Sequence, residues 1–345
     1  MELQLITVNH MNEFDIADHL RLSLQLRLHD PSLADVEAYR LFNGFYEGLP
    51  GLVIDVYGNT VVIKNHNRQP DKIPVSINRV LQILSEELPS MESVLLKIRH
   101  SDHPEERKGL FLRGERLPDR ITEKDICYAL DLRLHQDDSF YLDTRNLRAW
   151  LRKHSHRKRV LNFFAYTGSL GVAALAGGAI SVLQTDSNSE FLSLAERSQR
   201  LNRLPSVMRV WASDYFKAGS QLKQAKSLFD IVILDAPFFS RSRFGEVDLQ
   251  KDFVSLINKA RPLVAHEGLL IVINNSLFVP GSQVIGEINQ LSQAGYLSLE
   301  QTVEIPQDIR GYPESIHSAP PVDPAPFNHP TKISILRILR KDQAV

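Results

Sequence analysis

The sequence predicts an α/β fold with a mostly parallel sheet, preceded by a smaller α+β domain. From residue 143 onward, apolar stretches of strand length alternate with stretches of helical periodicity. This alternation is typical of parallel strands joined by right-handed crossovers. Three of the strands end in a tight turn or a carboxylate, which indicates a nucleoside-binding site at the carboxyl ends of the sheet. The 345 residues are enough for two domains with separate cores.

The smaller domain is predicted over residues 1–125. Its expected elements are a helix over 14–28, a β-unit over 38–65, a helix over 74–88 and a strand over 93–99. Within the β-unit, Gly58-Asn59 separates two apolar stretches, which predicts a β-hairpin. A strand over 126–135 is expected to lead into the second domain.

The second domain is predicted over residues 126–345 and contains a seven-stranded sheet. Its expected strands cover 159–165, 179–185, 207–213, 229–235 and 268–274, followed by two near 296–305 and 332–339. Its expected helices cover 145–153, 168–176, 189–201, 215–225, 249–260 and 282–294. No helix is expected between the last two strands, so they should form a C-terminal antiparallel hairpin. The Pro-rich stretch 313–330 is the longest irregular segment.

The composition limits the possible functions. The formal net charge is −1, so contact with a nucleic acid must depend on local basic patches. The single cysteine, Cys127, excludes an intrachain disulfide and suits a reducing compartment. The chain lacks a signal-peptide pattern and any apolar run of the roughly 20 residues that span a membrane. We therefore expect a cytoplasmic protein with no membrane segment, and the spacing of His100 and His103 does not predict a metal site.

A candidate cofactor site follows three strands in turn. The turn Ala165-Tyr-Thr-Gly168 ends the first strand, Asp186 the second and Asp214 the third. The turn has neither the G-x-G-x-x-G pattern nor a P-loop lysine, which favours a ligand without a pyrophosphate. Asp186 is placed to accept hydrogen bonds from ribose hydroxyls, and Asp214 to meet an adenine amino group. Either aspartate alone is more typical of a helix N-cap or a turn, but their succession predicts a nucleoside pocket.

Several motifs occur in an order that resembles one family. They are Phe140-Tyr-Leu-Asp-Thr-Arg-Asn-Leu-Arg148, Leu161-Asn-Phe-Phe-Ala-Tyr-Thr-Gly168, Thr185-Asp-Ser187, Ala195-Glu-Arg197 with Leu201-Asn202, Leu234-Asp-Ala-Pro-Phe-Phe-Ser-Arg-Ser242 and, in the smaller domain, Tyr39-Arg-Leu-Phe-Asn-Gly44 and Gly48-Leu-Pro-Gly-Leu-Val-Ile-Asp-Val-Tyr-Gly58. They resemble class I S-adenosylmethionine-dependent methyltransferases that modify large-subunit ribosomal RNA, a group with 5-methylcytosine and 7-methylguanine enzymes. The resemblance covers about residues 38–340. It implies a Rossmann-like methyltransferase domain, S-adenosylmethionine as cofactor and ribosomal RNA as partner.

The resemblance also implies roles for matching residues. Asp143 and Arg145 would lie over the methionine end of the cofactor, with Arg145 paired to its carboxylate. Residues 164–168 would line the methionine and the ribose. The complete set of expected cofactor contacts is Tyr141, Asp143, Arg145, Phe164, Ala165, Tyr166, Thr167, Gly168, Asp186, Ser187, Asp214 and Tyr215.

Asp235-Ala-Pro-Phe-Phe239 predicts the acceptor site. It resembles the Asp-Pro-Pro-Tyr/Phe loop of base-nitrogen methyltransferases, with Ala236 in place of the first proline. In that chemistry a carboxylate and a backbone carbonyl accept the N–H bonds of a base amino group and make its nitrogen a better nucleophile. Pro237 restricts residue 236 to extended geometry, and Phe238 or Phe239 would stack on the base. We therefore assign Asp235, Ala236, Pro237 and Phe238 to catalysis and expect a single-stranded or flipped-out base.

Two departures from the family narrow this interpretation. Its 5-methylcytosine enzymes need a cysteine nucleophile in the loop after the fifth strand, and here that region reads Val272-Ile-Asn-Asn-Ser-Leu277. Cys127 lies far upstream in an expected strand, so we expect a buried structural thiol and reject Cys-dependent cytosine chemistry. Family members often begin with an RNA-binding PUA module, and about 37 residues precede the resemblance here, too few for one. RNA docking would then fall to the smaller domain and the sheet edge, with Arg241 and Arg243 as candidates for phosphate contacts.

Three functions remain open at this stage. The main hypothesis is methylation of a base nitrogen in ribosomal RNA. The second is a methyltransferase that acts on a small molecule or a protein. The third is a non-catalytic RNA-binding factor that has kept the fold, which Ala236 and the missing cysteine would permit.

Overall fold

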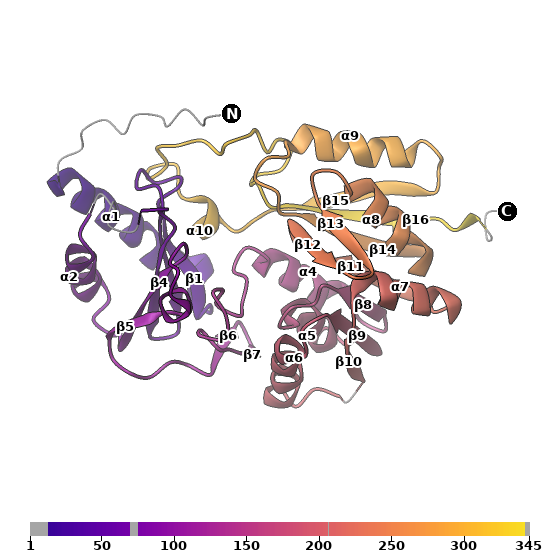
Figure 1. Cartoon of the computed structure of the whole chain (residues 1–345), viewed down its shortest axis with the longest axis horizontal. Coiled ribbons are helices and arrows are strands. Elements are labelled where there is room, and N and C mark those ends of the chain that lie inside the picture. The colour runs from indigo at the N-terminus through magenta and orange to yellow at the C-terminus, as the bar shows by residue number, and fades with distance from the viewer. Residues whose placement is uncertain (1–12, 70–74, 206, 342–345) are drawn as a thin grey trace. The chain divides into compact units, whose positions relative to one another are not determined.

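Residues 13–69, 75–205 and 207–341 are described in a computed structural model of the chain (Figure 1). The chain forms two compact units. The first unit takes its residues from Met1–Lys124, Asp131–Asp138 and Gln307–Ala319. The second takes them from Asp125–Leu130, Ser139–Pro306 and Pro320–Val345. Each unit therefore joins segments that are distant in the sequence.

The first unit is built on a five-stranded sheet with the order β1-β2-β3-β4-β5. Its strands are β1 Ala38–Asn43, β2 Leu52–Tyr57, β3 Thr60–Asn65, β4 Ser93–Ile98 and β5 Leu110–Arg113, with β6 Arg120–Glu123 outside this sheet. Its helices are α1 Glu13–Leu28, η1 Pro31–Leu33, α2 Ile77–Glu87, α3 Pro104–Lys108 and α10 Gln307–Arg310. The expected hairpin is confirmed, because Tyr57 pairs with Thr60 across Gly58-Asn59.

Helix α2 is needed because β3 and β4 are parallel neighbours and require a crossover. Ser76 begins this helix as its N-cap, and its side chain accepts the N–H of Arg79. The predicted helix over 74–88 is thus confirmed as α2, although residue 74 lies outside the described residues. Leu20 and Leu24 of α1 and Ile83 of α2 are fully buried in the core of this unit.

Charged side chains are also buried in the first unit. Asp138 is 4% exposed, and its carboxylate pairs with Lys64 and with Lys97, whose Nζ lies 2.7 Å away. The hydroxyl of Tyr57 donates to the same carboxylate at 3.2 Å. Burial alone would favour the neutral acid, but the two lysine charges prevail and lower the pKa of Asp138 far below its ordinary value. The first unit therefore depends on an ionised carboxylate between two lysines.

Asp138→Asn should lower the free energy of unfolding of the first unit by about 3–5 kcal/mol, because Lys97 would stay buried without its counter-charge. Urea unfolding near neutral pH measures this loss. Asp137→Asn is the matched control, since its partly exposed carboxylate pairs with Arg99 at 2.7 Å, and a surface pair contributes less than about 1 kcal/mol. The pKa of Asp138 is lowered, so its stabilisation should be present above the unfolded pKa and be lost as the pH falls. Equal losses in the two variants would contradict a dominant role for Asp138.

The second unit is built on a seven-stranded sheet with the order β10-β9-β8-β11-β14-β16-β15. Its strands are β8 Arg159–Phe163, β9 Ser181–Asp186, β10 Met208–Ala212, β11 Phe229–Leu234, β14 Val264–Asn274, β15 Leu297–Val303 and β16 Lys332–Ile338, with the short strands β7 Ile126–Ala129, β12 Phe239–Ser242 and β13 Gly245–Asp248 outside this sheet. Its helices are α4 Arg145–His154, α5 Ser169–Ala176, α6 Ser189–Leu201, α7 Tyr215–Gln224, α8 Phe253–Ala260, η3 Arg261–Leu263 and α9 Gly281–Ser292.

The predicted Rossmann-like topology is confirmed. The ladders from β10 to β14 are parallel, whereas β16 runs antiparallel to both β14 and β15. The strand order reverses between β8 and β11, which is the switch point where ligands bind in such sheets. Phe163 pairs with Thr185 on one side and with Leu234 on the other. The loops after β8, β9 and β11 therefore leave the sheet at the same level.

Several details differ from the prediction. The strand expected over 126–135 ends at Ala129, because Asp131 starts a turn in which its carboxylate accepts the N–H of Arg133. Strand β14 begins earlier than predicted, at Val264. The short helix α10 lies between the last two strands of the sheet in sequence. The expected helix over 249–260 begins only at Phe253.

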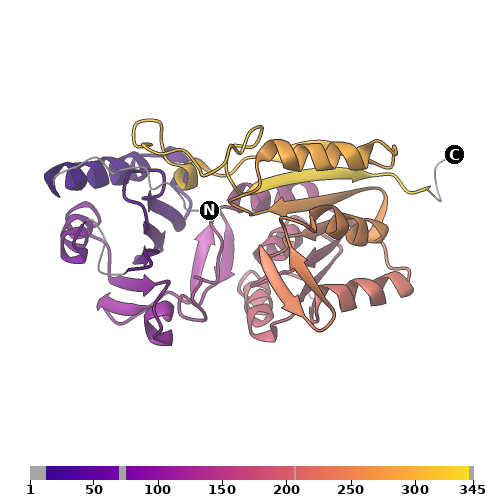
Figure 2. The same ribbon diagram turned by 45° about the horizontal axis from the view of Figure 1, so that its top comes forward.

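The residues before α8 include a hairpin that the sequence did not predict. Strands β12 and β13 pair antiparallel from Phe239↔Asp248 to Ser242↔Gly245, and they are visible in Figure 2 as two short orange arrows joined by a turn. The N–H of Leu249 then donates to the carbonyl of Phe238 and closes the hairpin at its base. Residues 235–238, the predicted acceptor loop, therefore lead directly into this hairpin.

Candidate cofactor and acceptor site

The loop after β8 has a strained backbone. Phe164 and Tyr166 have φ angles of 53° and 52°, and Gly168 has a φ of 77°. Left-handed conformations of non-glycine residues cost on the order of 1 kcal/mol each and occur most often at functional sites. The N–H of Ala165 donates to the carbonyl of Thr185 at 2.9 Å, and the hydroxyl of Thr167 donates to the carbonyl of Ser139 at 2.6 Å. The neighbouring segments thus hold the loop in this conformation.

Gly168 is required at the end of this loop. A Cβ at this position would lie 2.4 Å from the Cβ of Ala195 and 2.7 Å from the Nε2 of Gln184. Gly171, in α5, is similar, because a Cβ there would lie 2.4 Å from the side chain of the same glutamine. Gln184 is fully buried in β9 and accepts a hydrogen bond from Asn162 at 3.0 Å. The two glycines therefore let the loop and α5 approach β9 closely.

Asp186 joins the ends of two strands. Its carboxylate accepts the N–H of Tyr166 at 2.9 Å and that of Asn188 at 3.0 Å, and the N–H of Ser187 also bonds to it. Burial nevertheless raises the pKa of Asp186 above its ordinary value. A carboxylate has about four lone-pair sites, so these three donors leave room for a further hydroxyl donor such as that of a ribose.

Asp214 acts as the N-cap of α7. Its Oδ1 accepts the N–H of Phe216 at 2.8 Å and that of Lys217 at 3.3 Å. The cap uses one carboxylate oxygen, so the predicted contact with an adenine amine would depend on the other. Tyr215 is buried, and its hydroxyl donates to the carbonyl of Leu256 at 2.9 Å. Its ring stacks on that of Phe164, with the ring centres 5.0 Å apart. Tyr215 therefore supports the loop after β8 through its ring.

The segment before α4 supplies the residues expected at the methionine end. The Tyr141 ring lies 5.1 Å from that of Tyr166 and is 45% exposed. Asp143 accepts a hydrogen bond from the hydroxyl of Thr331 at 3.0 Å. Arg145, the first residue of α4, is 8% exposed.

Arg148 positions this segment, a role that sequence reasoning missed. Its guanidinium donates to the carbonyl of Tyr141 and to the hydroxyl of Thr144, both at 2.8 Å. It also lies 4.2 Å from the centre of the Phe140 ring, in cation–π geometry. Arg148 lies one helical turn beyond Arg145, within a matching motif, which is the one signal in the sequence that pointed to it.

Asp235 follows β11 and has no hydrogen-bond partner within the described part of the chain. Burial and the charge of Asp143 raise its pKa to about 7. Ala236 is 1% exposed, and its carbonyl accepts a long hydrogen bond of 3.4 Å from the Nδ2 of Asn275. The structure thus brings the acceptor loop near Asp143, which the sequence assigned to the cofactor.

The aromatic residues after Asp235 are exposed. Phe238 is 40% and Phe239 is 55% exposed, whereas Pro237 is half-buried. The Phe238 ring lies 6.4 Å from that of Phe278 in a T-shaped arrangement. A ring edge and a neighbouring ring face at a strand end suit the stacking of a planar base.

The sequence shows which family the chain belongs to. A sequence model for S-adenosylmethionine-dependent methyltransferases matches residues 46–311, which is more than half of the chain. The chain belongs to the S-adenosylmethionine-dependent methyltransferase family. S-adenosylmethionine is therefore its cofactor, and the residues fit it, because Asp186 keeps acceptor capacity for a ribose and Asp214 keeps a second carboxylate oxygen.

Relatives of this methyltransferase include ribosomal RNA enzymes. The chain is 30% identical over 261 residues to the ribosomal RNA large subunit methyltransferase I of Aeromonas salmonicida, covering 74% of this chain and 66% of that protein. It is 29% identical over 244 residues to the enzyme of the same name from Shigella flexneri, covering 70% and 61%. The match thus spans less than two thirds of the length of these relatives. A methyltransferase structure from Streptococcus mutans shares the fold, with a TM-score of 0.80 and 22% identity over 96% of this chain and 82% of that one.

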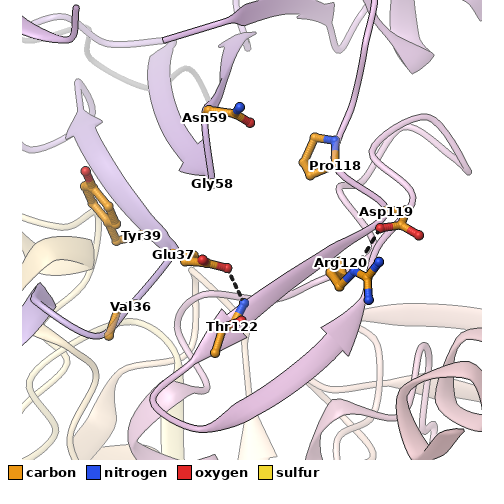
Figure 3. A pocket seen from close by; sticks show the side chains of 9 residues that line it. All are labelled: Val36, Glu37, Tyr39, Gly58, Asn59, Pro118, Asp119, Arg120 and Thr122. Atoms are coloured by element: carbon orange, nitrogen blue, oxygen red, sulfur yellow. Dashed lines mark hydrogen bonds and ion pairs between the residues drawn. The ribbon is translucent and has the colours of Figure 1, made fainter. Parts of the chain in front are cut away.

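The first unit of the methyltransferase has a cavity of its own, with a volume of about 690 Å³ (Figure 3). None of the predicted site residues lines it. Glu37 accepts the N–H of Thr122 at 2.6 Å inside the cavity, and Arg120 pairs with Asp119 at 3.2 Å. The charged groups that line this cavity are thus already engaged.

Across 13–69, 75–205 and 207–341, no group of three or more His, Cys, Asp or Glu residues is arranged to hold a metal ion. No helix of those ranges has the length and apolar character needed to cross a membrane. Cys127 is half-buried rather than buried as expected, and Asn202 bonds both its N–H and its carbonyl.

Gly168→Ala should weaken cofactor binding by the methyltransferase at least tenfold, because the new Cβ would displace the loop from β9 and keep an unfavourable φ. Isothermal titration with S-adenosylmethionine measures this change. Gly286→Ala is the matched control, since that glycine lies in α9 with nothing near its Cβ position. The control should bind as wild type and be slightly more stable, by about 0.5–1 kcal/mol. Unchanged binding by the Gly168 variant would contradict the assigned role of this loop.

Asp235→Asn should be more stable than wild type at alkaline pH. The raised pKa means that the carboxyl's contribution to stability is present at low pH and is lost as the pH rises through about 7. Asparagine does not ionise and escapes this loss. The difference in free energy of unfolding between the variant and wild type should grow to about 2 kcal/mol between about pH 5 and about pH 8. Each unit of pKa shift corresponds to about 1.4 kcal/mol, and solvent screening reduces the total. Urea unfolding across this range tests the prediction, and a difference that does not vary with pH would contradict it.

Proposed function

We propose that this methyltransferase modifies a base nitrogen in large-subunit ribosomal RNA. The observation that carries the proposal is Asp235, a carboxyl at the end of β11 without a hydrogen-bond partner among the described residues, next to the Ala236 carbonyl and the exposed Phe238. The relatives named as ribosomal RNA methyltransferases support the choice of RNA. A cytoplasmic location is part of the same proposal.

In this proposal, residues at three strand ends hold the cofactor, which supplies an electrophilic methyl group when bound. Asp186 accepts hydrogen bonds from the ribose, and Asp214 accepts one from the adenine amine through its second carboxylate oxygen. Arg145 pairs with the carboxylate of the methionine part. Tyr141 and Tyr166, whose rings lie side by side at 5.1 Å, cover the sugar and exclude water.

The acceptor nitrogen is handled by Asp235 and Ala236. The carboxylate and the carbonyl each accept an N–H bond of the base, which draws the nitrogen lone pair out of the ring and toward the methyl group. The proton released from the nitrogen then passes to Asp235, whose pKa of about 7 suits a general base near neutral pH. Phe238 stacks on the base and fixes its plane.

The loop after β14 supports nitrogen rather than carbon chemistry. Cysteine is needed for attack on C6 of a cytosine, whereas this loop offers Asn274 and Asn275. The contact of Asn275 with the Ala236 carbonyl supplies a restraint that the missing proline does not. RNA docking by the first unit, as a separate domain, completes the proposal.

Asp235→Ala should reduce methyl transfer at least a thousandfold while cofactor affinity stays within about threefold of wild type, because the carboxylate acts on the acceptor nitrogen. The protein is incubated with methyl-labelled S-adenosylmethionine and unmodified ribosomal RNA, both naked and as subunits. Mass spectrometry of the digested nucleosides then identifies the product.

A label on guanine or adenine nitrogen would support the proposal and name the base. Labelled 5-methylcytosine would overturn the argument from the missing cysteine. Wild-type turnover by Asp235→Ala would remove Asp235 from the mechanism, and a protein that binds cofactor yet labels no RNA would point to a different acceptor.

A further inference from the structure

Exposed apolar side chains gather in two loops of the second unit. They are Phe238, Phe239, Phe244, Leu277 and Phe278, each between 40% and 55% exposed, and together we call them the aromatic surface. Phe238 follows β11 and Phe278 follows β14, which are neighbours in the sheet, and the two rings meet at 6.4 Å. Clustered exposed apolar side chains usually mark a binding surface.

The hairpin of β12 and β13, which carries Phe239 and Phe244, packs against the rest of the second unit through one face. Val247 is 1% exposed and packs in the core of the second unit. At the turn, a Cβ on Gly245 would lie 2.5 Å from the Phe216 ring, so the hairpin backbone touches α7 closely. Alternate residues of a strand point to opposite faces, and Phe239 and Arg241 therefore share the exposed face. The hairpin backbone is thus packed against the core and α7 on one face, which leaves Phe239 on the other.

Positive charges lie beside the Phe244 ring at the hairpin turn. The Arg243 guanidinium is 4.7 Å and the Lys217 ammonium 5.9 Å from the centre of the Phe244 ring. Two acidic groups also lie on the hairpin, but Glu246 pairs with Arg241 at 3.4 Å and Asp248 pairs with Lys251 at 3.0 Å. The remaining charge next to the Phe244 ring is therefore positive.

The basic run over 152–159 is less suited to an anionic ligand. Arg152 pairs with Asp125, and Arg159 pairs with Asp230 at 3.3 Å. Those two guanidinium groups already form ion pairs with carboxylates, whereas Arg243 and Lys217 lie over the Phe244 ring. Large exposed apolar side chains lie on the hairpin, whereas residues 152–159 have none.

We propose that the aromatic surface binds a single-stranded RNA segment next to the target nucleotide, with bases stacked on the rings and phosphates at Arg243 and Lys217. This rests on the proposed function to the extent that it takes RNA as the partner. Every base has a π-face, so stacking tolerates any sequence, and neighbouring cations follow the backbone. A duplex hides its base faces inside the stack and cannot use the rings in this way. The surface would therefore select unpaired RNA around the target.

The test is fluorescence anisotropy of a short unstructured RNA oligonucleotide and of the same strand in a duplex. Wild type should bind the single strand more tightly. Phe244→Ala and Phe278→Ala should each weaken that binding about tenfold, in keeping with the loss of one stacked base. Arg243→Gln should lower the slope of log affinity against log salt by about 0.7, which corresponds to one lost phosphate contact.

Ile180→Ala is the matched control, because Ile180 is a 54% exposed apolar residue outside the aromatic surface. It should bind RNA as wild type, and all four variants should bind S-adenosylmethionine as wild type. On an RNA substrate that is methylated, Phe244→Ala should raise KM and leave kcat unchanged, whereas loss of Asp235 lowers kcat. The anisotropy result stands even where no RNA is methylated, so failure of the proposed function is distinguishable from failure of this surface.

Three results would overturn the proposal. Wild type that does not bind the single strand, or binds the duplex equally well, would remove unpaired RNA as the ligand. Phe244 and Phe278 variants that bind RNA as wild type would place the RNA elsewhere. Sedimentation that shows a dimer in wild type and a monomer in Phe244→Ala, at equal RNA affinity, would assign the surface to a second copy of the chain.

Discussion

The close approach of the loop over 164–168 to β9 is the constraint on which the site depends. The loop keeps its left-handed residues because β9 supplies acceptors for its amides and a glutamine under its glycines. Asp186 is the main contact, since it accepts the N–H of Tyr166 and still has acceptor capacity left. The contact that shapes the loop thus also fixes the carboxylate assigned to the ribose. Structure and binding are coupled in one side chain.

The three strand-end aspartates contribute differently to stability. Asp214 caps α7 and so favours the folded state, as N-caps usually do by about 1 kcal/mol. Asp186 and Asp235 lie where burial raises their pKa, so their ionised forms are costly in the folded protein. Natural proteins accept such costs where a ligand or a reaction needs the charged group. The N-cap of Asp214 thus serves the fold, whereas the ionised forms of Asp186 and Asp235 are costly in the folded protein and are available for a ligand or a reaction.

Much of the fold could be predicted from the sequence, because strands and helices of full length carry clear periodicities. The hairpin of β12 and β13 was missed, since four-residue strands with charges are too short to show a period. The strand over 126–135 was drawn too long, because its alternation continues past the turn that the Asp131 carboxylate makes. Strand-end residues such as Asp186 could be named from position alone. Thr331 could not, because its partner, Asp143, lies far away in the sequence.

The two departures from the methyltransferase pattern meet at one contact. Ala236 replaces the proline that would stiffen the acceptor loop, and Asn275 lies in the loop where 5-methylcytosine enzymes carry cysteine. The Asn275 amide reaches the Ala236 carbonyl at 3.4 Å. An amide is no nucleophile, so it does not attack a pyrimidine, but it can hold the carbonyl that receives an N–H bond. Loss of the proline and loss of the cysteine thus agree with each other, because the residue in the cysteine's loop restrains the loop that lacks the proline. The proposed nitrogen chemistry uses the Ala236 carbonyl that this contact restrains, whereas attack on a cytosine carbon needs a cysteine that this loop lacks.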